Sequence, residues 1–150
     1  MWTKELFGTE KPIIALLHLD PLPGDPDFCG SLDTVIEHAS CDVRALQEGG
    51  VDGVLIANEF SFPMTYVSHT ETLMAMACVI GAIKKDIHVP FGTNVVMNPE
   101  ETIRMAKAVG ASFGRSAFAG AFTGTYGVHV NNFGENVRLK YALGIPEMKL

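Results

Sequence analysis

The sequence predicts an α/β protein in which strands and helices alternate around a parallel sheet. Apolar runs without a polar face, such as residues 54–57, suit strands that are covered on both sides. Longer stretches of helical periodicity separate these runs. Glycine-led segments at residues 50–53, 110–113 and 144–147 each end a predicted helix and lead into a strand. Such repeated βα units imply parallel strands joined by right-handed crossovers.

Composition favours one globular domain, residues 1–150, and its charge argues against a nucleic-acid partner. The chain has 150 residues, of which 47% are apolar and 19% charged, enough to form a hydrophobic core. Its 17 acidic and 11 basic residues give a net charge of −6, and no basic cluster exceeds Lys84-Lys85. We therefore expect no nucleic-acid partner, because that binding depends on a basic surface that displaces counterions.

Cysteine usage and hydropathy predict a cytoplasmic protein without membrane insertion. Cys29, Cys41 and Cys78 are odd in number and lack the close pairing of a zinc or redox motif, which favours reduced thiols. The first residues lack the basic start and apolar core of a signal peptide. The longest apolar run, residues 73–83, is far shorter than the roughly 20 residues that a membrane span needs.

The first half of the chain contains two predicted βα units after a polar lead-in at residues 1–11. A strand is expected at residues 12–18, and a stiff loop with three prolines follows at 21–26. Ser31 is a suitable N-cap for a helix over residues 32–48, which Gly49 and Gly50 end. The second strand then occupies residues 54–57.

The second unit ends with a helix whose apolar surface covers most of its circumference. Ser68 to Glu71 has the spacing of a capping box, and the helix is expected to end at Lys84-Lys85. Met74 and Val79 widen its apolar stripe, which would fit a subunit interface as well as a core. A third strand is expected at residues 90–97.

The rest of the chain predicts a clear helix, a weak strand and a glycine-rich loop. Asn98 as cap and Pro99 at the first helical position start a helix that Gly110 ends. A weaker strand follows at residues 112–118 and a loop at 119–130. The last expected elements are a helix from Asn131 or Asn132 to Leu143 and the start of a fifth strand at residues 147–150.

Two architectures fit this order of elements. An open, doubly wound parallel sheet would be complete at this length. A (β/α) barrel needs about 250 residues and eight units, so the chain would supply roughly its first half. The loop after the first strand has neither the Gly-x-Gly-x-x-Gly pattern nor the P-loop of a nucleotide-binding sheet.

Several segments together resemble the BtpA/SgcQ family over residues 2–150, and more closely its SgcQ branch. The segments are residues 18–26, 49–53, 58–60, 90–95 and 110–113. The resemblance implies a TIM barrel of the ribulose-phosphate-binding type, of which this chain is the N-terminal half. Family members are described as factors in photosystem I biogenesis or as enzymes near sugar-uptake genes. The sequence departs from the family at Gly114, where an apolar residue commonly precedes the arginine.

Polar residues at the carboxyl ends of the predicted strands are the candidate site, because barrels place their active sites there. Glu59 and His18 are candidate catalytic groups that could transfer protons. The candidate substrate-binding residues are Asp20, Asn58, Asn94 and Arg115. The amides suit a carbonyl or hydroxyl, and the guanidinium suits an anion.

Each candidate also has a structural alternative. Glu59 could be a solvated carboxylate, His18 a histidine hydrogen-bonded in the core, and Arg115 the partner of a carboxylate. Asp20 could brace the proline loop. A divalent metal at His18, Asp20 and Glu59 suits the ligand types, but no spacing motif supports it and no cofactor is predicted.

The leading functional hypothesis is a barrel protein that binds or converts a small phosphorylated or sugar-like metabolite, with Glu59 as acid/base. One alternative is a non-catalytic assembly factor of the photosystem I type. Another is a truncated, inactive fragment, because half a barrel would expose strand edges and an apolar interior. For the same reason we expect the chain to form homo-oligomers.

Overall fold

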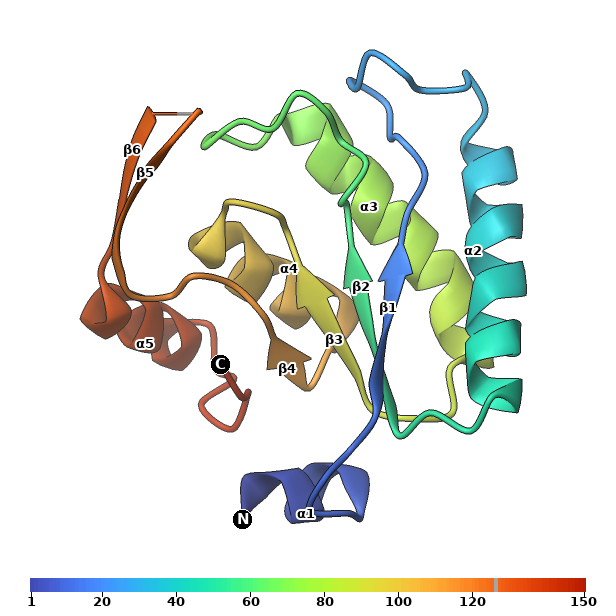
Figure 1. Ribbon diagram of the computed structural model, residues 1–150, viewed down its shortest axis with the longest axis horizontal. Helices are drawn as coiled ribbons and strands as arrows, with labels where there is room; N and C mark the ends of the chain where they lie inside the picture. The colour runs from blue at the N-terminus through green and yellow to red at the C-terminus, as the bar shows by residue number, and fades with distance from the viewer. Residues whose placement is uncertain (126) are drawn as a thin grey trace.

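A parallel sheet forms the centre of the molecule (Figure 1). The computed structural model describes residues 1–125 and 127–150. Across these residues the sheet has four strands, which lie side by side in the order in which they occur in the chain. They are β1 (Ile14–His18), β2 (Gly53–Ala57), β3 (Phe91–Asn94) and β4 (Phe113–Gly114). A doubly wound sheet reverses its strand order at a switch point, whereas the four described strands follow one another without a reversal.

The helices follow one another in the same order as the strands. They are α1 (Trp2–Phe7), α2 (Leu32–Glu48), α3 (Thr70–Ile83), the 3-10 turn η1 (Lys84–Asp86), α4 (Pro99–Val109) and α5 (Phe133–Ala142). Consecutive helices pack together, α2 on α3, α3 on α4 and α4 on α5. Figure 1 shows α2, α3 and α4 along one face of the sheet. In the described part of the chain, no helix is both long and apolar enough to span a bilayer.

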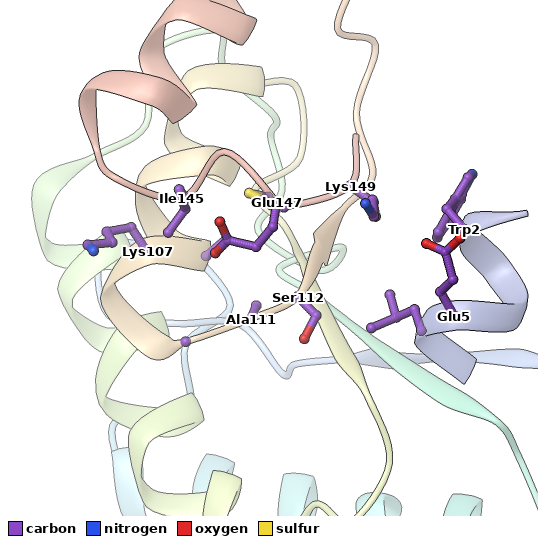
Figure 2. A pocket seen from close by; sticks show the side chains of 12 residues that line it. Trp2, Glu5, Lys107, Ala111, Ser112, Ile145, Glu147 and Lys149 are labelled. Carbon is purple, nitrogen blue, oxygen red and sulfur yellow. The ribbon is translucent and has the colours of Figure 1, made fainter. Parts of the chain in front are cut away.

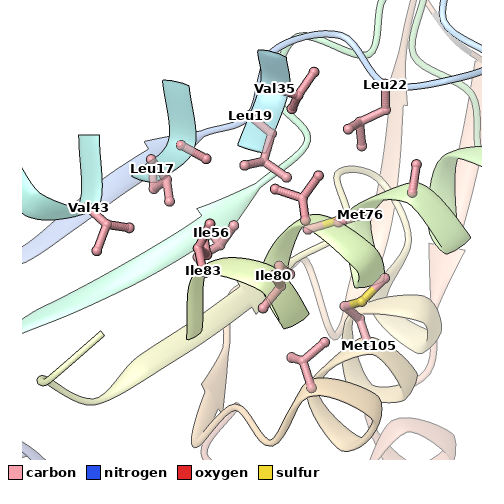
Figure 3. Packing of buried hydrophobic residues seen from close by; sticks show 14 of the residues in the cluster. Leu17, Leu19, Leu22, Val35, Val43, Ile56, Met76, Ile80, Ile83 and Met105 are labelled. Carbon is pink, nitrogen blue, oxygen red and sulfur yellow. The ribbon is translucent and has the colours of Figure 1, made fainter. Parts of the chain in front are cut away.

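The hydrophobic core lies between that sheet face and helices α2, α3 and α4 (Figure 3). Alternate residues of β1 and β2, including Leu17 and Ile56, point into it. The helices contribute Val35, Val43, Met76, Ile80, Ile83 and Met105. Burying one such side chain contributes about 1.5–3 kcal/mol, so this layer is the main source of stability.

The helices begin close to the residues that the sequence predicts, but not every predicted capping hydrogen bond forms. Ser31 caps α2 as expected, because its Oγ accepts from the Thr34 amide at 3.2 Å. The capping box predicted before α3 does not form: His69 is the N-cap and its side chain makes no capping bond. Asn98 precedes α4, but its side chain donates to the carbonyls of Thr65 and Val96 instead.

The wide apolar stripe of α3 is divided between core and surface. Val79 is fully buried among the core residues, so it belongs to no exposed interface. Met74 is 64% exposed. Of the two alternatives expected for this stripe, a core and a subunit interface, the structure shows the core for Val79, because α3 packs between α2 and α4.

Three segments differ from the sequence-based expectation. Residues 1–11 are not a plain lead-in, since α1 forms and ends at Gly8 in the left-handed conformation. The expected loop at 119–130 contains an antiparallel hairpin of β5 (Gly120–Gly124) and β6 (Gly127–Asn131). The expected fifth strand is reduced to one parallel bridge between Phe113 and Lys149.

The sheet face opposite the helices is covered by α1 at its amino end, whereas part of β1 on this face is exposed. Alternation places Leu16, Gly92 and Phe113 on this face, and the Phe7 ring of α1 meets the Phe113 ring edge-on with centroids 5.5 Å apart. A Cβ on Gly92 would lie 2.4 Å from the Phe113 ring, so a glycine is required there. Leu16 remains 45% exposed.

Replacing Gly92 by alanine should therefore destabilise the chain. The added methyl would displace the Phe113 ring from its contact with Phe7, and overpacking of this kind costs about 1–3 kcal/mol. Urea unfolding measures the change. Gly81→Ala in α3 is the matched control, because its Cβ would meet nothing within 4 Å and should be neutral or stabilising. Equal unfolding midpoints for Gly92→Ala and the unsubstituted chain would contradict the packing described.

Candidate functional site

Three polar side chains from successive strands meet at the carboxyl end of the sheet. Glu59 follows β2, Asn94 ends β3 and Arg115 follows β4. Arg115 Nη2 lies 3.7 Å from Glu59 Oε2. With its amide in the orientation that satisfies both groups, Asn94 accepts from Arg115 Nη2 at 2.8 Å and donates to the Arg115 carbonyl at 2.9 Å. The structure thus brings together three of the residues predicted from the sequence.

The register of β3 and β4 produces this meeting. Thr93 pairs with Gly114, and the Arg115 amide donates to the Thr93 carbonyl at 3.2 Å, so Asn94 and Arg115 are level with each other. Thr93 faces the helices, since its Oγ1 donates to the Thr102 carbonyl in α4 at 3.1 Å. Asn94 and Arg115 therefore point to the opposite face.

Gly114, where the sequence departs from the family pattern, fits this register. A Cβ at Gly114 would lie 2.8 Å from Met148 Cε and 3.0 Å from Thr102 Cγ2. The missing side chain allows α4 and the C-terminal segment to approach β4 closely. The departure is thus compatible with the expected position of the arginine.

The three side chains line a cavity of about 370 Å³. Its other walls come from the ends of β3 and β4 and from the β5–β6 hairpin. The remaining lining residues are Val96, Met97, Ser116, Ala117, Phe122, His129 and Asn131. An apolar cavity with a few converging polar groups is the usual form of a small-molecule site.

The Glu59–Arg115 pair is partly exposed to solvent, with 37% of the Glu59 side chain and 50% of the Arg115 side chain accessible. An ion pair at this exposure contributes about 0–1 kcal/mol to stability. The expected alternative, in which Arg115 pairs with a carboxylate, is thus what the structure shows. Because the pair is weak and open, both groups can exchange their mutual contact for contacts with a ligand.

His18 lies on the same sheet face but does not line this cavity. Its ring meets the Phe60 ring edge-on, with centroids 5.8 Å apart. Its Nε2 is buried and has no hydrogen-bond partner among the described residues. The structure therefore supports neither a core hydrogen bond at Nε2 nor direct contact with Glu59.

Asn58 and Asp20 point elsewhere. Asn58 is buried, and its Oδ1 accepts from the Val96 amide at 2.9 Å, which ties the loop after β2 to the loop after β3. Asp20 Oδ2 lies 2.6 Å from Nδ1 of His38 on α2. The structure brings neither residue into the cavity.

The metal alternative at His18, Asp20 and Glu59 is not assembled. Asp20 is turned to α2 and Glu59 to Arg115. Within residues 1–125 and 127–150, no group of three histidine, cysteine or acidic side chains is placed to hold a metal ion.

The hairpin supplies site residues that were not among the sequence candidates. His129 stacks on Tyr66, with ring centroids 4.5 Å apart and an interplanar angle of 4°. Its Nε2 is buried without a hydrogen-bond partner among the described residues. The alternation of Phe122, Val128 and Val130 with polar residues was the available signal, but three glycines in the segment favoured a loop.

A larger cavity of about 480 Å³ lies at the other end of the sheet (Figure 2). Figure 2 shows Trp2 and Glu5 of α1 on one side and Glu147 and Lys149 of the C-terminal segment nearby. It adjoins Ser112, where the chain enters β4. Parallel α/β folds place their chemistry at the carboxyl ends of the strands, so the smaller cavity is the candidate site.

A family model described as the BtpA family matches residues 9–149. The chain belongs to the BtpA family. The resemblance seen in five segments of the sequence is thereby confirmed.

Two relatives show both branches of the BtpA family. The sgc region protein SgcQ of Escherichia coli strain K12 is 45% identical over 99% of this chain and 56% of its own length. The photosystem I biogenesis protein BtpA of Synechocystis is 32% identical over 93% of this chain and 50% of its own length. The chain thus spans about half the length of these BtpA-family relatives.

A solved structure supports the fold of this BtpA-family chain. The 7,8-dihydropteroate synthase of Vibrio fischeri, a TIM-barrel enzyme, superposes with a TM-score of 0.52 at 14% identity. The match covers 93% of this chain and 61% of the synthase. At this identity the likeness concerns the fold alone, and it agrees with the sequential parallel sheet.

Proposed function

We propose that the chain forms the first half of a TIM barrel of the ribulose-phosphate-binding type. The whole barrel binds a small phosphorylated or sugar-like metabolite. The observation that carries the proposal is the convergence of Glu59, Asn94 and Arg115, from three successive strands, on one cavity. The sequential strand order and the likeness to a barrel enzyme support the architecture.

The three side chains have complementary roles in this proposal. Arg115 presents several N–H donors in a fixed plane, which suits two oxygens of one ligand. Asn94 offers both a donor and an acceptor to a hydroxyl or carbonyl group. Glu59 is the acid/base, because a carboxylate at hydrogen-bond distance from a ligand hydroxyl or C–H acid can accept its proton.

His18 is the candidate second proton-transfer group. It ends β1, beside Ala57 of β2, which pairs in turn with Asn94 of β3. Its unpaired Nε2 can accept or donate a proton according to the tautomer. A ligand that extends across the face from Arg115 towards β1 would approach it.

Replacing Arg115 by methionine in a full-length protein that carries this sequence should weaken binding of D-ribose 5-phosphate. Loss of a charged hydrogen bond corresponds to roughly 10- to 100-fold in affinity, measured by titration calorimetry. Glu59→Gln should abolish turnover of any substrate that the full-length protein converts. It should change the affinity for D-ribose 5-phosphate less than Arg115→Met does. Arg104→Met is the matched control, because Arg104 pairs with Glu100 and Glu101 on α4 and does not line the cavity. Equal affinities for Arg115→Met and Arg104→Met would contradict the proposed site.

A second candidate function is a non-catalytic assembly factor. The 32% identity to the photosystem I biogenesis protein BtpA favours it. Under this function a protein partner should co-purify with the full-length protein and remain bound when Glu59 and Arg115 are both replaced. Loss of that partner in the double variant would favour the metabolite site instead.

We also propose that copies of this chain associate through the open sheet face. Leu16 is 45% exposed there, and in the described part of the chain β1 has no strand on its outer side.

Light scattering of the 150-residue chain should give a mass above that of one copy, and Leu16→Lys should lower it, because a charge on that face opposes association. Met74→Lys, on the exposed surface of α3, is the control and should leave the mass unchanged. A monomeric unsubstituted chain, or a lower mass in Met74→Lys alone, would contradict this interface.

A further inference from the structure

The β5–β6 hairpin presents one face to the cavity. Phe122 and His129 pair directly across its two strands, and Gly120 pairs with Asn131. Because alternate residues of a strand point to opposite faces, Phe122, His129 and Asn131 share one side of the hairpin. All three line the cavity, whereas Val128 and Val130 lie on the other side and are more than two-thirds exposed.

Contacts at both ends hold this hairpin face in place. His129 stacks on Tyr66 in the loop before α3, and the Tyr66 hydroxyl donates to the Gly127 carbonyl at 3.3 Å. The Asn131 amide donates to the Ala117 carbonyl beside β4. The Phe122 ring lies over Gly120, where a Cβ would come within 3.3 Å of it. The cavity therefore has a preformed aromatic wall opposite the polar strand ends.

The charges around the cavity nearly balance. One carboxylate, Glu59, lies 3.7 Å from one guanidinium, Arg115. The other polar lining groups are the amides of Asn94 and Asn131, the Ser116 hydroxyl and the His129 imidazole. A phosphoryl group carries about two negative charges and favours an excess of cationic or backbone N–H donors. A set of amides, one carboxylate and one guanidinium matches a neutral ligand with many hydroxyl groups.

We infer that this cavity binds the ring of a sugar, not its phosphoryl group. The inference rests on the proposed function and names the part of the ligand that this half of the barrel recognises. The apolar C–H face of the ring packs on Phe122, and its hydroxyls bind Glu59, Asn94 and Arg115. In TIM barrels phosphate groups are frequently bound by the loops after strands seven and eight, which agrees with a sugar-ring site on strands two to four.

The test uses the full-length protein and four probes, D-ribose, D-glucose, D-ribose 5-phosphate and inorganic phosphate. A neutral sugar should bind and compete with the sugar phosphate. If inorganic phosphate binds, its affinity should not depend on Phe122. Phe122→Leu should weaken binding of the neutral sugar and of the sugar phosphate by the same factor, roughly 3- to 10-fold. Phe122→Trp should retain affinity, because it keeps an aromatic face.

Phe133→Leu is the matched control, because this exposed phenylalanine begins α5 and does not line the cavity. Circular dichroism of each variant checks that the fold is kept. If sugar phosphate binding depends on Arg115 but Phe122→Leu behaves like Phe133→Leu, the inference is overturned and the proposed function stands. The inference would also be overturned if Phe122→Leu weakened the binding of inorganic phosphate. If neither a sugar nor a sugar phosphate binds, both the inference and the proposed function are wrong.

Discussion

The parallel pairing of β3 with β4 is the constraint on which the candidate site depends. It places Asn94 level with Arg115 and turns both side chains away from the helices. The buried Thr102 hydroxyl supports this register from α4, since it accepts from the Val95 amide at 3.0 Å and donates to the Asn98 carbonyl at 3.0 Å. A shift of β4 by one residue would turn Arg115 away from Asn94 and towards the core, where an unpaired guanidinium is strongly unfavourable.

Glycines at two positions make this pairing compatible with tight packing on both faces. Gly92 leaves room for the Phe113 ring on the open face, and Gly114 leaves room for Met148 and Thr102 on the helix face. The β3–β4 pair thus carries two glycines that leave no room for a side chain and also two of the site residues. Stability and function are coupled there, so substitutions at β4 are expected to affect both.

The sequence predicted the four βα units because their apolar periods and helix-ending glycines are local signals. It also predicted Glu59, Asn94 and Arg115, because each lies where a strand ends. It could not show that Asn58 and Asp20 turn to Val96 and His38, since those partners are distant in sequence. The hairpin was missed because Gly120 and Gly127 suggested a loop, whereas both adopt positive φ angles at its ends.

We propose that a ligand lies between the strand ends and the hairpin. A crystal structure of the full-length protein with bound D-ribose 5-phosphate tests it most directly. We expect the sugar ring to lie against Phe122, with its hydroxyl groups in hydrogen-bond contact with Glu59, Asn94 and Arg115. A ligand at the amino ends of the strands, in the cavity between α1 and Lys149, would contradict it.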